Sequence, residues 1–158
     1  MISHDTEGSL GLVMNKRFKG PITLNQMIPE LKDAPEVPVF LGGPVDRETL
    51  FFIHTFQELD GAFPLGGGVY LNGDFEYIKN YIRSEKPTEG RIRFFTGYAG
   101  WSYNQLQKEI DNNAWLIGNS HPMRFLQNHF HNFWTDCMND LGHPYSFWAK
   151  YPVIPSLN

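Results

Sequence analysis

The clearest pattern of hydrophobic and polar positions lies in residues 91–117, and the rest of the chain is organised around it. Residues 92–96 are rich in β-branched and aromatic side chains, with arginine alternating with apolar residues at the start, and this predicts a central strand. Two glycines, Gly97 and Gly100, come next. Because glycine adopts positive φ at little cost, they predict a tight turn after the strand.

A helix is predicted directly after this turn. Ser102 and Gln105 have the spacing of a capping box, in which the serine oxygen accepts from a free amide of the first turn and the glutamine reaches back. One apolar stripe follows at helical spacing, made of Tyr103, Leu106 and Ile110. Asn112 and Asn113 tolerate the left-handed conformation that ends helices, and residues 114–117 then predict another extended strand.

The remaining pattern predicts further short strands and helices. Thr23 and Gln26 form a second capping box, and Pro29 ends that helix near Ile28, since proline lacks an amide proton and clashes with the preceding turn. Asp74 is in position to cap another helix. Runs of β-forming residues predict strands at 10–14, 37–41, 49–56 and 69–71. C-terminal helices are predicted to begin near Pro122, Asn132 and Tyr145.

Length and composition favour one folded domain. A chain of 158 residues is long enough for an ordinary core, and we expect a single α+β domain spanning residues 1–158. Charged residues make up 19% of the chain and aromatic residues 15%, which is typical of a core-rich protein. The formal net charge of -4 argues against a large nucleic-acid footprint, which needs clustered lysine and arginine. We therefore expect no direct nucleic-acid binding.

The cysteine content favours a reducing compartment. Cys137 is the single cysteine, so no internal disulfide can form, and its apolar neighbours indicate a small hydrophobic residue on a helix. No apolar run approaches the roughly 18 residues of a membrane span, and the polar N-terminal residues do not resemble a signal peptide. We therefore expect a cytoplasmic protein that does not enter the membrane.

The glycine-rich segments after two predicted strands are the best candidates for a binding site. Backbone amides are free where strands end, ligands often bind there, and the predicted helix start at Ser102 could hold an anion. Glycine at a turn more often serves backbone geometry alone, and the lysine of a phosphate-binding loop is missing, so both interpretations stay open. If there is a ligand pocket, we expect its walls to be Asn15, Gly43, Gly97, Tyr98, Gly100, Trp101 and Trp115.

An enzymatic function has weaker support. His121, His129 and His131 lie close together in the sequence, but no spacing typical of a zinc site is present. Neither Ser102 nor Cys137 lies in a nucleophile motif. We therefore expect no catalytic residues, no metal and no cofactor. The alternative is an undiscovered hydrolase or metal-dependent enzyme that uses the strand-end pocket or the C-terminal histidines.

Several motifs in register resemble those of the AlgH/YqgE family of bacterial proteins. They are GSLGLVMNK, FLGGPV, VYLNGDFEYI, RFFTGYAGWSYNQLQKEI, NNAWL and VIPSLN, and the similarity runs from residue 2 to residue 158. The resemblance implies a compact α+β domain with a branched mixed sheet flanked by helices, in a cytosolic protein. Some members carry the label of transcriptional regulator, and the resemblance supplies no catalytic residues to transfer.

The resemblance also implies a missing N-terminal segment. Family members carry one or two further strands before the point that matches residues 2–4, so either Met1 is an internal methionine or this protein lacks an edge strand. Residues 10–14 would then lack a neighbour on one side, and an open strand edge invites pairing with another chain. We therefore expect low solubility or a homodimer formed through this strand.

The function that the sequence favours is non-catalytic binding. We expect the partner to be an unknown small ligand or a protein. No helix-turn-helix pattern accompanies the acidic charge, so regulation of transcription, if the family label applies, would act indirectly through such a partner.

Overall fold

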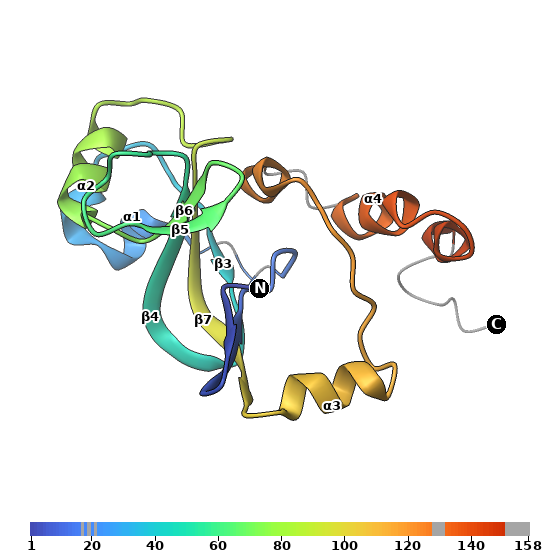
Figure 1. Ribbon diagram of the computed structural model, residues 1–158. Helices are drawn as coiled ribbons and strands as arrows, with labels where there is room; N and C mark the ends of the chain where they lie inside the picture. Colours follow the sequence, from blue (N-terminus) through green and yellow to red (C-terminus); the bar gives the residue numbers. More distant parts are fainter. Residues whose placement is uncertain (17, 19, 21, 128–131, 151–158) are drawn as a thin grey trace.

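Strand β7 (Ile92–Ser102) is the centre of the sheet in the computed structural model, which describes residues 1–16, 18, 20, 22–127 and 132–150 (Figure 1). Within these residues the sheet has seven strands in the order β1-β2-β7-β4-β6-β5, and β3 branches off by pairing with β7. The β3–β7 pair is parallel and the other pairs are antiparallel, so the predicted mixed, branched sheet is confirmed. The other strands are β1 (Ser3–Asp5), β2 (Gly8–Gly11), β3 (Val39–Leu41), β4 (Val45–His54), β5 (Phe63–Gly66) and β6 (Val69–Leu71).

Both faces of the sheet are covered, because successive side chains of a strand point to opposite sides. Phe94 and Phe95 of β7 are both fully buried and belong to two different clusters. Phe94 packs with Leu24 of α1 (Leu24–Met27) and Ile78 of α2 (Phe75–Arg83). Phe95 packs with Leu126 on the other face. Figure 1 accordingly shows α1 and α2 on one side of the sheet and α4 (Phe133–Asp140) on the other.

Two of the predicted helix starts are confirmed. The Thr23 amide donates to Gln26 Oε1 at 3.3 Å, and α1 gives way to a 3-10 turn, η1 (Pro29–Leu31), where Pro29 was expected to end the helix. The carboxylate of Asp74 accepts from the amides of Glu76 and Tyr77 at 2.9 and 3.3 Å, and so caps α2.

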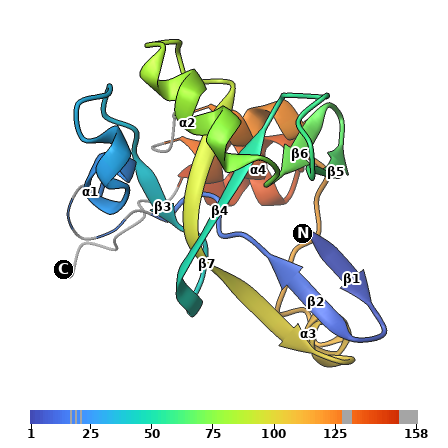
Figure 2. The same cartoon turned by 90° about the vertical axis from the view of Figure 1, so that its left-hand side faces the viewer.

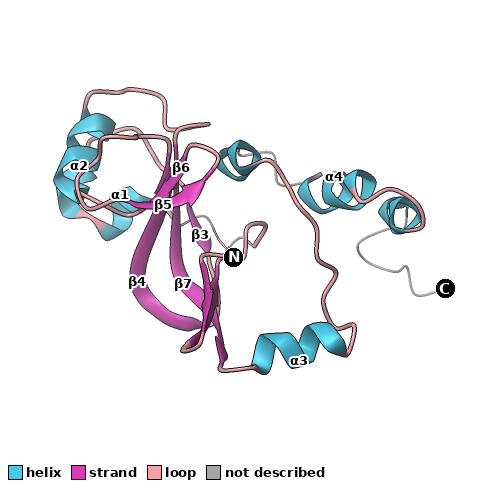
Figure 3. Ribbon diagram, in the orientation of Figure 1, coloured by secondary structure: helices cyan, strands magenta, loops and turns pink. Residues whose placement is uncertain are grey.

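The helical elements of the C-terminal part differ in how firmly they are packed. Its elements are α3 (Gln105–Asp111), η2 (Pro122–Leu126), α4 and η3 (Tyr145–Lys150), in the order expected from the sequence. Leu126 of η2 is fully buried in the cluster around Phe95, whereas α4 and η3 contain no buried residue. Figure 3 shows the segment between α3 and η2 as a long loop. The position of α4 therefore depends on partly buried contacts rather than on the core.

The predicted turn at Gly97 and Gly100 is wrong, because β7 continues through both residues to Ser102. Gly97 has a φ of +68°, and the β4–β7 register shifts between Val45 and Leu50, so the glycine marks an irregularity inside a strand. Figure 2 shows the result: β7 runs on beyond the part of the sheet that α2 covers and carries β1 and β2 at its far end.

The elements next to β7 also differ from the prediction. Helix α3 begins after Asn104, which has a left-handed φ of 58°, although half of the predicted capping box forms: the Ser102 amide donates to Gln105 Oε1 at 3.0 Å. Residues 114–117 are not in a strand, and the side chain of Ile117 is 65% exposed. The sequence alone did not reveal that residues 114–117 find no neighbouring strand.

The N-terminal strands correct a further expectation. β1 pairs with β2 along three residue pairs, and β7 pairs with β2 on its other side. The expectation that residues 10–14 lack a neighbour on one side is therefore wrong at Leu10, which pairs with Ser3 of β1 and with Gly100 of β7. The edge of the sheet is β1, and a homodimer formed through this edge stays a prediction. β5 was also missed, because its residues lie in a segment that was taken as a loop.

Candidate functional site

The strand that replaces the predicted turn separates the two rings expected to wall the pocket. Tyr98 and Trp101 are three residues apart in β7, so their side chains lie on opposite faces of the sheet. The Tyr98 ring makes an edge contact with Phe51 at 5.9 Å and lies over Gly100. The Trp101 ring lies over Gly11 on the other face.

The glycines expected to line the pocket are instead in close backbone contact. A Cβ atom on Gly43 would lie 2.0 Å from the carbonyl carbon of Tyr98, and one on Gly97 would lie 2.8 Å from the carbonyl oxygen of Gly43. The segment after β3 can approach β7 this closely only because side chains are missing. At Gly43 and Gly97 the glycines therefore serve backbone geometry, and no hollow separates them.

Three of the seven residues predicted to wall the pocket line an open groove. Tyr98, Gly100 and Trp101 border a groove of about 410 Å³ that is open to solvent, with Asp5 and Glu7 at its margin. Asn15, Gly43, Gly97 and Trp115 are not among its lining residues. Asn15 is exposed in the turn after β2, and Trp115 lies against the Trp101 ring, on the face of β7 opposite to the Tyr98 ring. Ligand binding in the groove stays a prediction, and an open groove covers little of a small molecule's surface.

The two tryptophans hold helix α3. Both indole N–H groups donate to Oε2 of Glu109, from Trp101 at 3.1 Å and from Trp115 at 2.7 Å, while Gln105 donates to Oε1 at 3.0 Å. The pKa of Glu109 is lowered, first by the bond from Trp115 and then by the bond from Gln105. The indole rings are 5.7 Å apart in an edge arrangement. Because their indole N–H groups are bonded to Glu109, we interpret the two tryptophans as structural residues that hold α3 next to β7.

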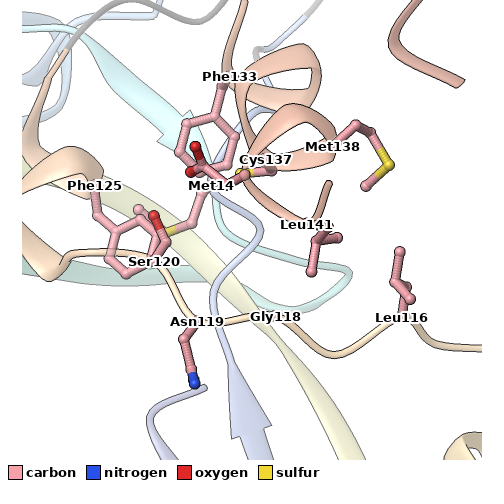
Figure 4. Close-up of a pocket in the computed structure, with 11 residues that line it drawn as sticks. Met14, Leu116, Gly118, Asn119, Ser120, Phe125, Phe133, Cys137, Met138 and Leu141 are labelled. Carbon is pink, nitrogen blue, oxygen red and sulfur yellow. The ribbon is translucent and has the colours of Figure 1, made fainter. Parts of the chain in front are cut away.

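A second cavity has the shape that the predicted pocket lacks. It has a volume of about 240 Å³ and lies between the loop after β2, the segment before η2 and helix α4; we call it the C-terminal cavity. Figure 4 shows Phe125, Phe133 and Met14 on one side of it and Leu116, Met138 and Leu141 on the other. Its other lining residues are Gly118, Asn119, Ser120, Cys137 and Asp140.

Arg93 holds two of the segments that line this cavity. Its side chain is 1% exposed and lies on the same face of β7 as Phe95. The guanidinium donates to the carbonyl oxygen of Phe125 at 2.7 Å and also to that of Met14. It lies over the rings of Phe40 and Phe95 at 4.6 and 5.2 Å. One buried cation therefore joins two backbone segments that are far apart in sequence and that both line the cavity.

A few polar groups reach an otherwise apolar lining. The Ser120 hydroxyl oxygen is shielded from solvent and has no hydrogen-bond partner within the described residues. Asp140 is paired with Arg124. Burial raises the pKa of the Cys137 thiol, which makes it a poor nucleophile, in agreement with the prediction of a small hydrophobic residue on a helix. The described lining is therefore mainly apolar with a few polar groups, a composition typical of small-molecule sites.

The histidines give no second site in the part of the chain that the structure covers. His121 accepts a bond from the Met123 amide at the start of η2, and His129 and His131 lie outside the described residues. His54 is fully buried: one ring nitrogen contacts the Asn72 carbonyl oxygen at 2.7 Å, and the other accepts from the Phe56 amide at 3.1 Å. Burial lowers the pKa of His54, so this ring is a neutral part of the core.

No three His, Cys, Asp or Glu side chains among residues 1–16, 18, 20, 22–127 and 132–150 gather closely enough to hold a metal ion. No helix in this part of the chain has both the length and the apolar composition needed to cross a membrane.

Comparison with known proteins decides the family. The sequence profile described as AlgH-like matches residues 1–146. The chain belongs to the AlgH-like family. A UPF0301 protein of Bacteroides fragilis is 40% identical over 158 residues, which is 100% of this chain and 80% of that protein. A UPF0301 protein of Bacteroides thetaiotaomicron is 38% identical, with the same coverage.

Two solved structures share the fold. The crystal structure of a protein from Corynebacterium diphtheriae superposes with a TM-score of 0.72 at 21% identity, over 94% of this chain and 79% of that one. The solution structure of AlgH from Pseudomonas aeruginosa gives a TM-score of 0.70 at 21% identity, over 96% of this chain and 82% of that one. At this level of identity the similarity establishes the α+β fold of this AlgH-like chain. Its function has to be argued from the geometry of the site.

Sequence reasoning missed the C-terminal cavity for a physical reason. Phe133, Cys137 and Leu141 follow each other at intervals of four, which indicates one face of a helix. Nothing in this pattern says that Met14, which lies far earlier in the sequence, supplies the opposite wall. Arg93 was the one available signal for this cavity. An arginine inside a strand predicted to be central is expected to be buried, and a buried cation needs partners on neighbouring segments.

Proposed function

We propose that this AlgH-like protein is a non-catalytic binding protein that takes a small, mainly apolar molecule into the C-terminal cavity. The observation that carries the proposal is the cavity itself, with a volume of about 240 Å³ and walls of Met14, Phe125, Phe133 and Leu141. An apolar cavity of about 150 Å³ is sufficient for benzene, so this one has room for about ten non-hydrogen atoms.

The expected affinity is modest. At roughly 0.5 kcal/mol for each of about ten atoms, binding contributes about 5 kcal/mol, which corresponds to a Kd on the order of 10⁻⁴ M. A natural ligand that also bonds to the Ser120 hydroxyl would bind more tightly, because that buried oxygen has no partner within the described residues.

The same site suggests how binding is passed on. Helix α4 contains no buried residue, yet Phe133, Cys137 and Met138 of this helix line the cavity. A ligand adds contacts to the helix and stabilises its position against the sheet. We propose that regulation by this protein is indirect: the ligand changes the state of the C-terminal helices, and a protein partner responds to it.

Methyl NMR tests the proposal because the methionines report on different places. Of the five methionines, Met14 and Met138 line the cavity, whereas Met27 lies in α1 on the opposite face of the sheet. With ¹³C-methyl methionine and indole as the probe, the signals of Met14 and Met138 should shift and saturate, and that of Met27 should not. A Gly118→Leu variant should lose the response, since a Cβ at residue 118 would lie 2.9 Å from Leu141 and the side chain would occupy the cavity.

Two results would overturn the proposal. One is the absence of any shift at millimolar indole. The other is an equal response of all methionines, which would indicate contact with the surface rather than binding in the cavity.

A further inference from the structure

A second, smaller cavity adjoins the C-terminal cavity. It has a volume of about 100 Å³ and lies on the face of the sheet that carries Ile53 and Val69; we call it the sheet-face cavity. All of its lining residues are apolar: Met1, Ile2, Leu12, Met14, Ile53, Leu65, Val69, Pro122 and Phe125. Met14 and Phe125 line both cavities, so these two side chains form the partition between them.

The partition combines a fixed backbone with movable side chains. Arg93 holds the carbonyl oxygens of both Met14 and Phe125, so the main chain on either side of the partition is tied to β7. The Met14 side chain is unbranched and has three rotatable bonds, and it is only partly buried. Rotation of this side chain can join the two cavities while the hydrogen bonds of Arg93 stay intact.

The polar groups lie at one end of the joined space. Ser120, Asn119 and Asp140 line the C-terminal cavity, and no polar side chain lines the sheet-face cavity. The Ser120 hydroxyl can accept or donate a hydrogen bond. Asp140 already pairs with Arg124, so a carboxylate on a ligand would meet a negative charge whose cation is taken.

From this arrangement we infer that the two cavities are the two ends of one site for a single unbranched alkyl chain with an uncharged hydrogen-bonding head group. The head group bonds to Ser120, and the chain passes Met14 into the sheet-face cavity. An unbranched chain fits this arrangement because it needs only the flexible Met14 side chain to rotate, while the Phe125 backbone stays bonded to Arg93. This inference rests on the proposed function, since it assigns a ligand class to the same site.

A series of n-alcohols from butanol to dodecanol tests the inference by methionine methyl NMR. Short alcohols should shift the signals of Met14 and Met138 alone, whereas longer ones should also shift Met1, which lines only the sheet-face cavity. Affinity should rise about fourfold for each added methylene, the factor that corresponds to burial of one such group, and should level off when both cavities are full. Met27 serves as the internal control throughout, because it lines neither cavity.

A variant that fills one end provides the matched comparison. Leu65 is half-buried at the margin of the sheet-face cavity, so Leu65→Trp should fill it with little effect on folding, which the unchanged signal of Met27 and the melting temperature would verify. Butanol should bind this variant as it binds the wild type, whereas dodecanol should lose the gain that its extra methylenes give and no longer shift Met1. Decanoate should bind the wild type more weakly than decanol.

The outcomes separate the two proposals. If indole and butanol shift Met14 and Met138 but no alcohol shifts Met1, or if Leu65→Trp leaves the dependence on chain length unchanged, the single long site is wrong and the proposed function stands. If decanoate binds as tightly as decanol, the uncharged head group is wrong. If neither indole nor any alcohol produces a saturable shift, both proposals fail.

Discussion

Replacing Arg93 with methionine tests the role of the buried cation under the candidate site. The variant loses two charge-assisted hydrogen bonds, to the carbonyl oxygens of Phe125 and Met14, each worth about 1.5–3 kcal/mol. It also loses two cation–π contacts, at 4.6 and 5.2 Å, each worth about 1 kcal/mol. Against these losses, methionine removes the cost of burying a charge, which is several kcal/mol. We expect a net loss of about 3 kcal/mol.

The assay is urea unfolding followed by circular dichroism, with thermal melting in parallel. For a domain of this size about 3 kcal/mol corresponds to a fall in Tm of roughly 6–12 °C. Arg91→Met is the matched control on the same segment, because Arg91 is exposed and its bond to Thr55 Oγ1 is long at 3.4 Å. The control should change stability by less than about 0.5 kcal/mol.

A second readout links stability to the site. If Arg93 ties Met14 to the partition, the Met14 methyl signal should move in the Arg93→Met variant and the affinity for indole should fall. An Arg93→Met protein as stable as the control, with the Met14 signal in place, would refute the assignment of Arg93 as the residue that positions the Met14 and Phe125 segments.

Three further substitutions have defined outcomes. His54→Phe should lose less free energy of unfolding than the wild type when the pH falls from 7.5 to 5.0 in urea unfolding. Burial lowers the pKa of His54, so the unfolded chain binds the proton first and the wild type loses stability below about pH 6.5. Equal losses in the two proteins would contradict this. Glu109→Gln should reduce hydrogen-exchange protection of the α3 amides, because it weakens the bonds from the two tryptophans. Unchanged protection would contradict the role of these bonds in holding α3. Gly43→Ala should cost about 3 kcal/mol or more in chemical unfolding because its Cβ would lie 2.0 Å from Tyr98, whereas Gly20→Ala, with nothing within 4 Å, should be neutral; similar effects would contradict the close approach.

The parts of the fold that the sequence predicted are those set by local chemistry. Asp74 caps α2 because its carboxylate reaches amides two and three residues ahead, and Pro29 ends α1 because it has no amide to give. Residues 92–96 were expected to form a central strand, and Phe94 and Phe95 in this strand are both fully buried. The cap and the helix end depend only on neighbouring residues, whereas the burial of Phe94 and Phe95 is completed by distant segments that contain Leu24 and Leu126.

The errors came where distant segments decide the outcome. Gly97 and Gly100 are compatible with a turn or with an irregular strand, and the choice was made by pairing with β2 and with Val45 of β4. The predicted pocket followed from the turn, so its residues separated onto two faces once the strand continued. Trp115 was expected to wall a pocket, but its indole is bonded to Glu109 from six residues earlier.

The measurement that tests the central claim most directly is the intermolecular nuclear Overhauser effect between bound indole and the methionine methyl groups. Binding in the C-terminal cavity predicts contacts from indole protons to Met14 and Met138 and none to Met27, and the loss of those contacts in Gly118→Leu. Contacts to Met27, or contacts that persist unchanged in Gly118→Leu, would contradict the claim that this cavity is the binding site.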